Sequence, residues 1–224
     1  MEVSSSNPAL DIDLSMPDDD FIVAHGDNAY DLAKRIFDVT FSTLVIISVL
    51  VWLIPLLGLF IRLTSPGPVL VSRLRTGYKG RPFRCFSFRI TRDNNRNETS
   101  LTSKYDIRIT PIGRLLRRTH LDEMPQFINV LLGDMSVVGP HSHSPVLDAM
   151  YWESKGYRAR YLVKPGITGL AQVKSMMSSN WDKKNFQRTV KYDLFYIKKR
   201  SSQFDLAIVF MTLKAMIDGN QNTW

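Results

Sequence analysis

An uncharged run over residues 39–61 dominates the hydropathy pattern of the chain, and most of its positions are Val, Ile, Leu or Phe. At about 1.5 Å per residue, a helix of this length can cross a bilayer core of about 30 Å. A buried helix of a soluble core is the alternative, but such helices are usually shorter and less uniformly apolar. The pattern therefore predicts a membrane helix over residues 30–64.

Pro55 lies inside this run, and Gly58 follows it closely. Proline lacks a backbone N–H and clashes with the preceding turn, so a kink is expected near Ile54. Basic residues stand on both sides of the run: Lys34, Arg35, Arg62, Arg73 and Arg75. Positive charge at both ends disfavours translocation of either end. A hairpin that enters and leaves by one leaflet satisfies both observations, and a kinked spanning helix stays open from the residues alone.

Beyond residue 64 the pattern changes to short elements separated by turn residues. Two kinds of element are expected there, short strands at 69–71 and 83–89 and helices at 112–118, 125–132, 146–162, 183–199 and 204–217. A polar loop is expected at 93–104 and a strand-to-turn break at 137–140. The expected fold class is α+β and mostly helical, with residues 65–224 as one domain.

Three of these segments carry more specific expectations. Gly133 is expected to cap the helix at 125–132. Residues 164–169 are expected to form a tight loop, whose glycines either let backbone amides approach an anion or simply connect two elements. The apolar helix at 204–217 could pack in the core, but a position in the membrane interface is favoured because the domain already adjoins lipid.

The charge balance is uneven along the chain. Lys and Arg outnumber Asp and Glu by 29 to 21, yet residues 1–29 hold seven acids and no Lys or Arg. That segment is predicted to be a disordered acidic tail, and it lacks the cationic start of a signal peptide. The rest of the chain is strongly basic, which favours phosphate-bearing partners such as nucleotides, anionic lipid or nucleic acid. The single cysteine, Cys85, permits no internal disulfide and fits a reducing compartment.

The candidate chemistry centres on two adjacent carboxylates, Asp122 and Glu123, which follow a basic run. Arg114, Arg117 and Arg118 are three and four residues apart and share one helix face. A basic cluster beside two acids can hold a phosphate and a divalent cation together, as phosphoryl transfer requires. A solvated, salt-bridged turn is the plain alternative.

Six segments that occur in order resemble the bacterial sugar transferases of the monotopic phosphoglycosyl transferase type. They are residues 34–38, 65–69, 117–126, 129–136, 164–173 and 192–196. The resemblance implies transfer of a sugar-1-phosphate from a UDP-sugar to polyprenyl phosphate, with release of UMP. It implies a re-entrant membrane helix over 30–64 broken at Pro55, and a small catalytic domain over 65–224 with interfacial amphipathic helices, on the cytoplasmic face of the inner membrane.

The resemblance also assigns roles to residues. Asp122 is the expected nucleophile, assisted by Glu123, and a Mg²⁺ ion is expected to bridge Asp122 and the diphosphate. The residues expected near the substrate are Arg89, Arg117, His141, Arg160, Lys164 and Asp193. Membrane lipid is an expected partner, and a homodimer is left open. Because no groove-reading motif or aromatic stacking platform is present, nucleic-acid binding is not expected.

Several positions depart from the family pattern. Ser87 replaces a lysine, His141-Ser142 replaces Arg-Pro, and Lys174-Ser175-Met176 replaces Asn-Gly-Arg. Each change removes or displaces a positive charge, and one charged hydrogen bond is typically worth about 1.5–3 kcal/mol. Lys174 and His141 are expected to compensate in part, His141 best when protonated. Ile54 replaces the serine before the proline, so the kink is expected to be shallower.

These departures leave a second interpretation, a catalytically degenerate member that acts as a membrane-bound partner or scaffold. The segment 139–143 and the ending 220–224 resemble members that transfer a hexose-1-phosphate, which points to glucose or galactose. The residues do not determine the sugar, the nucleotide or the pathway.

Overall fold

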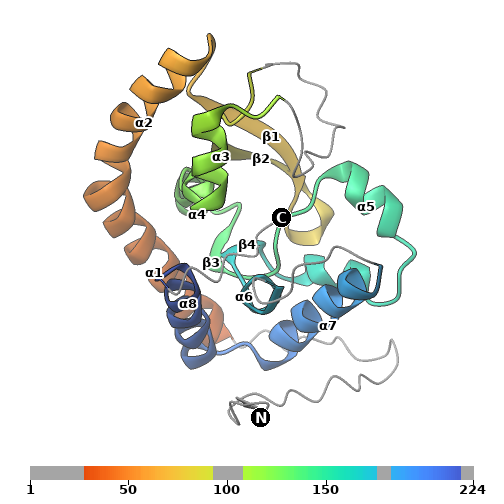
Figure 1. Cartoon of the computed structure of the whole chain (residues 1–224). Coiled ribbons are helices and arrows are strands. Elements are labelled where there is room, and N and C mark those ends of the chain that lie inside the picture. Colours follow the sequence, from red (N-terminus) through yellow and green to blue (C-terminus); the bar gives the residue numbers. More distant parts are fainter. Residues whose placement is uncertain (1–27, 93–107, 176–182, 218–224) are drawn as a thin grey trace, which may run out of the picture.

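The computed structural model describes residues 28–92, 108–175 and 183–217, and over these residues the protein is α+β and mostly helical, as predicted (Figure 1). The helices are α1 (Asn28–Val45), α2 (Val51–Thr64), α3 (Pro111–Arg118), α4 (Gln126–Leu132), α5 (Pro145–Tyr151), α6 (Leu170–Ser175), α7 (Lys183–Lys199) and α8 (Ser202–Ile217). The strands are β1 (Leu70–Thr76), β2 (Pro82–Phe88), β3 (Ser136–Val138) and β4 (Gly166–Thr168). The loop predicted at 93–104 and almost all of the predicted acidic tail lie outside the described residues.

α1 and α2 form one continuous helical stretch, joined by a π-helical segment, Ile46–Leu50. Figure 1 shows this stretch as a bow along one side of the molecule. The irregularity predicted near Ile54 lies earlier, where the Val51 N–H bonds to Ile46 O, and the helix then continues through Pro55. The proline ring crowds the turn before it, and the wider π turn ends at that point.

The helix Ala29–Thr64 is long and apolar enough, by length and composition, to cross a membrane. The most apolar part of this helix has a mean hydropathy of 2.9, and only 22% of that part is buried, unlike a helix of a soluble core. The positions that pack against the protein body include Phe37, Phe41, Val45, Leu50, Leu57 and Ile61. The first three join the main core with α4 and β3, and the last three join a smaller core with β2 and α3.

β1 and β2 form an antiparallel hairpin in which Arg73 lies opposite Cys85 and Arg75 lies opposite Phe83. β1 extends beyond the predicted strand at 69–71. In its second half only Leu74 is apolar, between Arg73 and Arg75, so the hydrophobic signal there is weak. Side chains two residues apart on a strand share a face, so Arg73 and Arg75 point to the same side of the hairpin.

Asn129 attaches α4 to the hairpin. Its side chain is fully buried, accepts a hydrogen bond from Phe86 N at 2.9 Å and donates to Arg84 O at 2.7 Å. The amide therefore pairs backbone groups at the edge of β2 that would otherwise be buried without partners. Gly133 ends α4 in the left-handed conformation with φ 92°, which confirms the predicted cap.

β3 and β4 form a parallel pair in which Ser136 lies opposite Gly166. The prediction of a loop over 164–169 was therefore wrong, since Gly166–Thr168 is a strand. A Cβ at Gly166 would lie 2.1 Å from Gly139 N, so close approach of two backbones explains this glycine.

The helix predicted at 146–162 is only partly correct. α5 ends at Tyr151, and a 3-10 segment, Tyr157–Leu162, follows after a turn. Gly156 adopts φ 75° between them, a conformation that interrupts a helix and suits glycine. The break directs the side chain of Arg160 into the interior, where it is 3% exposed.

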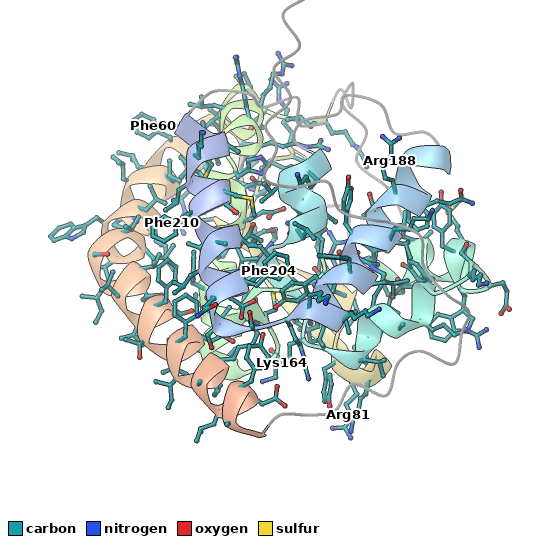
Figure 2. The ribbon with its side chains drawn as sticks, turned by 90° about the horizontal axis from the view of Figure 1, so that it is seen from below. Phe60, Arg81, Lys164, Arg188, Phe204 and Phe210 are labelled. Atoms are coloured by element: carbon teal, nitrogen blue, oxygen red, sulfur yellow. The ribbon has the colours of Figure 1, made fainter. Side chains whose placement is uncertain are left out.

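α7 and α8 confirm the two C-terminal helices of the prediction, and Figure 2 shows α8 running alongside the α1–α2 stretch. Asp205 of α8 joins the two elements. It accepts hydrogen bonds from Lys34 Nζ at 2.7 Å, Tyr30 OH at 3.0 Å and Tyr196 OH at 2.8 Å. The outer side of α8 is apolar and exposed, and Phe210 there is 68% exposed.

Candidate functional site

The two adjacent acids lie on a short turn between α3 and α4. α3 begins after Thr110, whose Oγ1 accepts a hydrogen bond from Gly113 N at 2.9 Å. After α3 ends, His120 adopts a left-handed conformation with φ 55°, and the 3-10 turn Leu121–Glu123 follows. The reversal at His120 turns the chain so that Asp122 and Glu123 precede α4 instead of extending α3.

Three arginines lie around the acid pair. Arg117 and Arg73 act electrostatically on Asp122, and Arg75 and Arg117 act on Glu123. The ion pairs seen within the described residues involve neither carboxylate, and the arginines act on them through longer-range electrostatics. The sequence predicted Arg117, but it noted Arg73 and Arg75 only as charges flanking the membrane helix. The sequence signal that could have identified them is their spacing of two residues, which places both side chains on one face of a strand.

The two carboxyl groups differ in how readily they ionise. Burial raises the pKa of Asp122 to about 6, against the attraction of Arg117 and Arg73. Burial, and then the charge of Asp122, raise the pKa of Glu123 to about 8. Neighbouring acids in this situation titrate as a unit, so the pair holds a proton to higher pH than two separate carboxyl groups would.

Arg160 and Asp193, both predicted near the substrate, form a buried ion pair with 2.7 Å between Nε and Oδ2. The Arg160 guanidinium also donates to His141 O at 2.8 Å and lies 2.8 Å from His143 Nδ1. His141 interacts electrostatically with Arg75, the arginine that also acts on the second carboxylate. Arg160 therefore links Asp193 to the His141 backbone, and Arg75 is the residue that acts on both His141 and the acid pair.

Arg89 and Lys164 are placed away from the acid pair. Arg89 is 2% exposed and donates to the carbonyls of Pro66 and Ser65, so it binds the end of α2. Lys164 lies near the first half of α1 (Figure 2), where burial and the charge of Arg35 lower its pKa. The structure thus gives both bases a local partner or neighbour that the sequence did not indicate.

His141 is neutral. Burial lowers the pKa of its ring to about 3, and the positive charges of Arg75 and Arg160 add to the effect. Sequence reasoning expected His141 to compensate best when protonated, and the low pKa places that form well below neutral pH, because a further positive charge among these arginines is unfavourable. His141 cannot replace the charge of an arginine at pH 7, although its ring still carries one N–H donor.

Two further polar groups in the segment 118–126 were missed. His120 Nε2 and Gln126 Oε1 are buried without a hydrogen-bond partner within the described part of the chain. A buried unpartnered polar atom in a folded protein usually marks a bound water or ligand. Both residues lie in the segment that sequence analysis identified, but only the structure shows their unsatisfied hydrogen-bonding atoms.

The two carboxylates fit a Mg²⁺ ion that takes part of its coordination from the protein and part from a substrate. Within residues 28–92, 108–175 and 183–217, no group of three or more His, Cys, Asp or Glu side chains is assembled for a metal. Asp122 and Glu123 can supply one or two carboxylate oxygens. Mg²⁺ commonly takes this many from the protein and the rest from water and phosphate oxygens.

Comparison with known proteins identifies the family. The family model described as bacterial sugar transferase matches residues 29–219, nearly the whole chain. The chain belongs to the bacterial sugar transferase family. The match begins in the α1–α2 stretch and includes the acid pair, which confirms the resemblance seen in the segments of the sequence.

Three relatives of this sugar transferase show how its family varies. A UDP-glucose:undecaprenyl-phosphate glucose-1-phosphate transferase of Escherichia coli is 40% identical over 81% of this chain and 39% of the relative. An exopolysaccharide production protein of Rhizobium leguminosarum is 38% identical over 80% of this chain and 92% of the relative. A UDP-N-acetylgalactosamine-undecaprenyl-phosphate N-acetylgalactosaminephosphotransferase of Aeromonas hydrophila is 35% identical over 72% and 38%. The chain thus spans about two fifths of the first of these, and the named sugars differ.

Proposed function

We propose that this sugar transferase moves a sugar-1-phosphate from a UDP-sugar to polyprenyl phosphate and releases UMP. The proposed sugar-1-phosphate is a hexose-1-phosphate. The reaction is the one named for its glucose and N-acetylgalactosamine relatives, with undecaprenyl phosphate as the lipid. It is the first membrane step of exopolysaccharide, capsule or glycoconjugate synthesis. The proposal rests mainly on one observation: two adjacent buried acids lie on the turn between α3 and α4, and Arg73, Arg75 and Arg117 act on them electrostatically.

That arrangement suits attack on a diphosphate. A carboxylate that approaches phosphate meets charge repulsion, which Arg73, Arg75 and Arg117 offset while they stabilise charge on the transferring phosphoryl group. Because Glu123 retains its proton more readily, the pair presents one negative charge instead of two. Asp122, with the lower of the two raised pKa values, is the nucleophile.

The bond changes balance over two steps. In the first, an Asp122 carboxylate oxygen bonds to the sugar-bearing phosphorus, and the bond from this phosphorus to the bridging oxygen breaks. UMP leaves with that oxygen and its electron pair. In the second, a phosphate oxygen of the polyprenyl phosphate bonds to the same phosphorus, and the Asp122 carboxylate is released. The covalent phosphosugar on Asp122 joins the two steps, so one site serves both substrates.

Mg²⁺ would be held by Asp122, with Glu123 adjacent, and would supply charge neutralisation on the diphosphate oxygens. The three arginines would neutralise the same negative charge of the diphosphate with their own side chains. His120 Nε2 and Gln126 Oε1 carry open hydrogen-bonding positions beside the acids and can position the substrate.

The α1–α2 stretch is proposed to be re-entrant, with both ends on the cytoplasmic face. Both ends are attached to the same protein body: Lys34 pairs with Asp205, and Arg89 binds the Ser65 carbonyl after α2. A spanning helix would place these ends on opposite sides of the bilayer. The exposed apolar side chains of the stretch include Leu44, Ile47, Trp52, Leu56, Leu59 and Phe60. With Phe210 and Leu213 of α8, they form the proposed lipid-facing surface.

The catalytic proposal is tested with purified protein in nanodiscs that contain polyprenyl phosphate and Mg²⁺, screened against UDP-sugars for UMP release. Wild type is expected to release UMP with one or more donors, and labelled donor should leave an adduct on Asp122. Asp122→Asn is expected to abolish both signals. UMP release unchanged in Asp122→Asn would reject the assignment.

The membrane proposal is tested by labelling single cysteines in inverted membrane vesicles. The native Cys85 is 5% exposed and gives little background. Leu32→Cys and Leu63→Cys, at the two ends of the stretch, are both expected to react with a membrane-impermeant maleimide from the cytoplasmic side. Trp52→Cys is expected to be protected by lipid. Reaction of one end from the opposite side only would establish a spanning helix.

A degenerate, scaffolding role is the second candidate, and it is favoured by a histidine at position 141, whose pKa is lowered by burial and by Arg75 and Arg160. Together with Ser87, this removes two positive charges that the resemblance places near the phosphates. If the wild type releases no UMP with any donor, His141→Arg with Ser87→Lys is expected to create activity under this interpretation. Activity of the wild type itself excludes it.

A further inference from the structure

His141 makes three contacts with its surroundings, two through its backbone and one through its ring. Its carbonyl accepts a hydrogen bond from Arg160 NH2 at 2.8 Å, and its backbone forms a parallel bridge with Gly166. Its ring nitrogen Nδ1 lies 3.0 Å from Gln172 Nε2. Within the described residues its other ring nitrogen, Nε2, has no partner, and the residue as a whole is half-buried.

The orientation of the Gln172 amide follows from a second contact. The same Gln172 Nε2 lies 3.0 Å from Ile167 O. A backbone carbonyl can only accept a hydrogen bond, so the atom that faces it must be the NH₂ group of Gln172. This group has two hydrogens, and the second points at His141 Nδ1. Nδ1 is therefore an acceptor.

A neutral histidine carries its proton on one nitrogen only, so an accepting Nδ1 places the proton on Nε2. The groups that surround the ring agree with a neutral form. Arg75, Arg160 and His120 act on it electrostatically, and His143 contacts its edge at 6.4 Å between ring centroids. Each of the two arginines disfavours a further positive charge at His141, and no acid is among these neighbours.

We infer that Gln172 is a positioning residue that fixes His141 as a neutral Nε2–H donor, directed at an oxygen of the nucleotide-sugar donor. The inference rests on the proposed function for the identity of the ligand. Arg75 connects the two regions, since it acts on both His141 and Glu123. In this chain a single uncharged N–H thus stands where the resemblance places an arginine. Binding of the nucleotide sugar therefore relies more on a directed hydrogen bond than on charge.

The decisive measurement is nitrogen NMR of the full chain, labelled with ¹⁵N-histidine, in nanodiscs. The chain has four histidines, and comparison with His141→Asn assigns the signals of this one. Protonated and unprotonated ring nitrogens resonate far apart. Between pH 6 and 8, His141 is expected to show an unprotonated Nδ1 and a protonated Nε2, and UDP-glucose or UMP is expected to shift the Nε2 signal.

Kinetics of Gln172→Met supply the second measurement. Loss of the fixed donor is expected to raise the KM for the UDP-sugar about three- to tenfold, with kcat changed less than about twofold. Gln172→Glu is expected to raise KM further, because a carboxylate draws the proton to Nδ1 and makes Nε2 an acceptor. The control is Gln187→Met, an exposed glutamine of α7, which should leave KM unchanged.

The outcomes separate this inference from the proposed function. A protonated Nδ1 in the wild type overturns the inference, as does an Nε2 signal that ignores both UDP-glucose and UMP. A KM for Gln172→Met equal to that of Gln187→Met also overturns it. If Gln172→Met does not fold, the wild-type spectra still decide. UMP release without an Nε2 response rejects the inference alone, and an Nε2 response without UMP release rejects only the proposed reaction.

Discussion

Arg160 Nε lies 2.7 Å from Asp193 Oδ2, and both side chains are 2% exposed. The two residues come from the 3-10 segment Tyr157–Leu162 and from α7, and the same guanidinium reaches His141 O. Three of the five N–H donors of Arg160 thus have protein partners. The ion pair therefore holds α7 against the 3-10 segment, and the bond from Arg160 to His141 O attaches the backbone at residue 141 to both.

Breaking this pair is expected to destabilise the fold. Asp193→Leu leaves Arg160 buried without its counter-charge, which typically costs about 3–5 kcal/mol in the free energy of unfolding. Urea denaturation in detergent measures the loss. The matched control is Arg160→Met with Asp193→Leu, which removes both charges and is expected to lose less. Equal losses in the single and double variants would contradict a buried ion pair.

Arg75 is expected to be needed for activity although it lies on a strand far from the acid pair in sequence. Arg75→Met removes one positive charge beside Glu123, and loss of a charged interaction of about 1.5–3 kcal/mol lowers kcat/KM roughly ten- to a hundredfold. The UMP-release assay measures it. Arg84→Met, which changes an exposed arginine of the adjacent strand, is expected to retain full activity. Similar activity in both variants would remove Arg75 from the site.

Asp122 is expected to link activity to pH. Its folded-state pKa is raised to about 6, above the ordinary value of 3.8, so the folded protein favours the protonated form. The nucleophile must be ionised, so kcat/KM is expected to fall as pH drops through about 6. A pH profile of UMP release checks this, and a profile flat between pH 5 and 7 would contradict it.

The same shift predicts an effect on stability. A raised pKa disfavours the folded state once the unfolded carboxyl ionises, so stability is lost as pH rises from about 4 to about 6. Asp122→Asn removes this cost and is expected to be more stable than wild type at pH 8, by a margin that shrinks toward pH 4. Thermal unfolding at both pH values measures the margin. A margin that grows as pH falls would show the opposite sign of the shift.

Two glycines are expected to respond in opposite ways to substitution by alanine. In Gly166→Ala the new Cβ would lie 2.1 Å from Gly139 N, so β3 and β4 must separate. In Gly58→Ala the nearest atoms are Val69 methyl carbons at 3.4 Å, and α2 gains about 0.5–1 kcal/mol from the better helix former. Thermal unfolding without any ligand compares them. If Gly166→Ala were as stable as wild type, backbone packing would not explain this glycine.

Much of the fold was predictable because its signals are local. The α1–α2 stretch, α3, α4, α7 and α8 each follow from an apolar run or a helical period with a cap. The misses share a cause. β1 carries Arg73 and Arg75 where a strand signal would be apolar, and β4 consists of Gly166–Thr168, which looks like a turn. Pairing with a distant segment decides both, and pairing leaves little trace in either strand alone.

The long apolar helix, the mostly helical α+β class and the acid pair could be predicted from the residues alone, because each depends on residues adjacent in the chain. Which bases face the acids became known from the folded arrangement. Arg73 and Arg75 reach them from β1, whereas Arg89 and Lys164 are engaged elsewhere. The protonation state of His141 also depends on the fold, because burial and charges from β1 and the 3-10 segment determine it, and these neighbours meet only when the chain has folded.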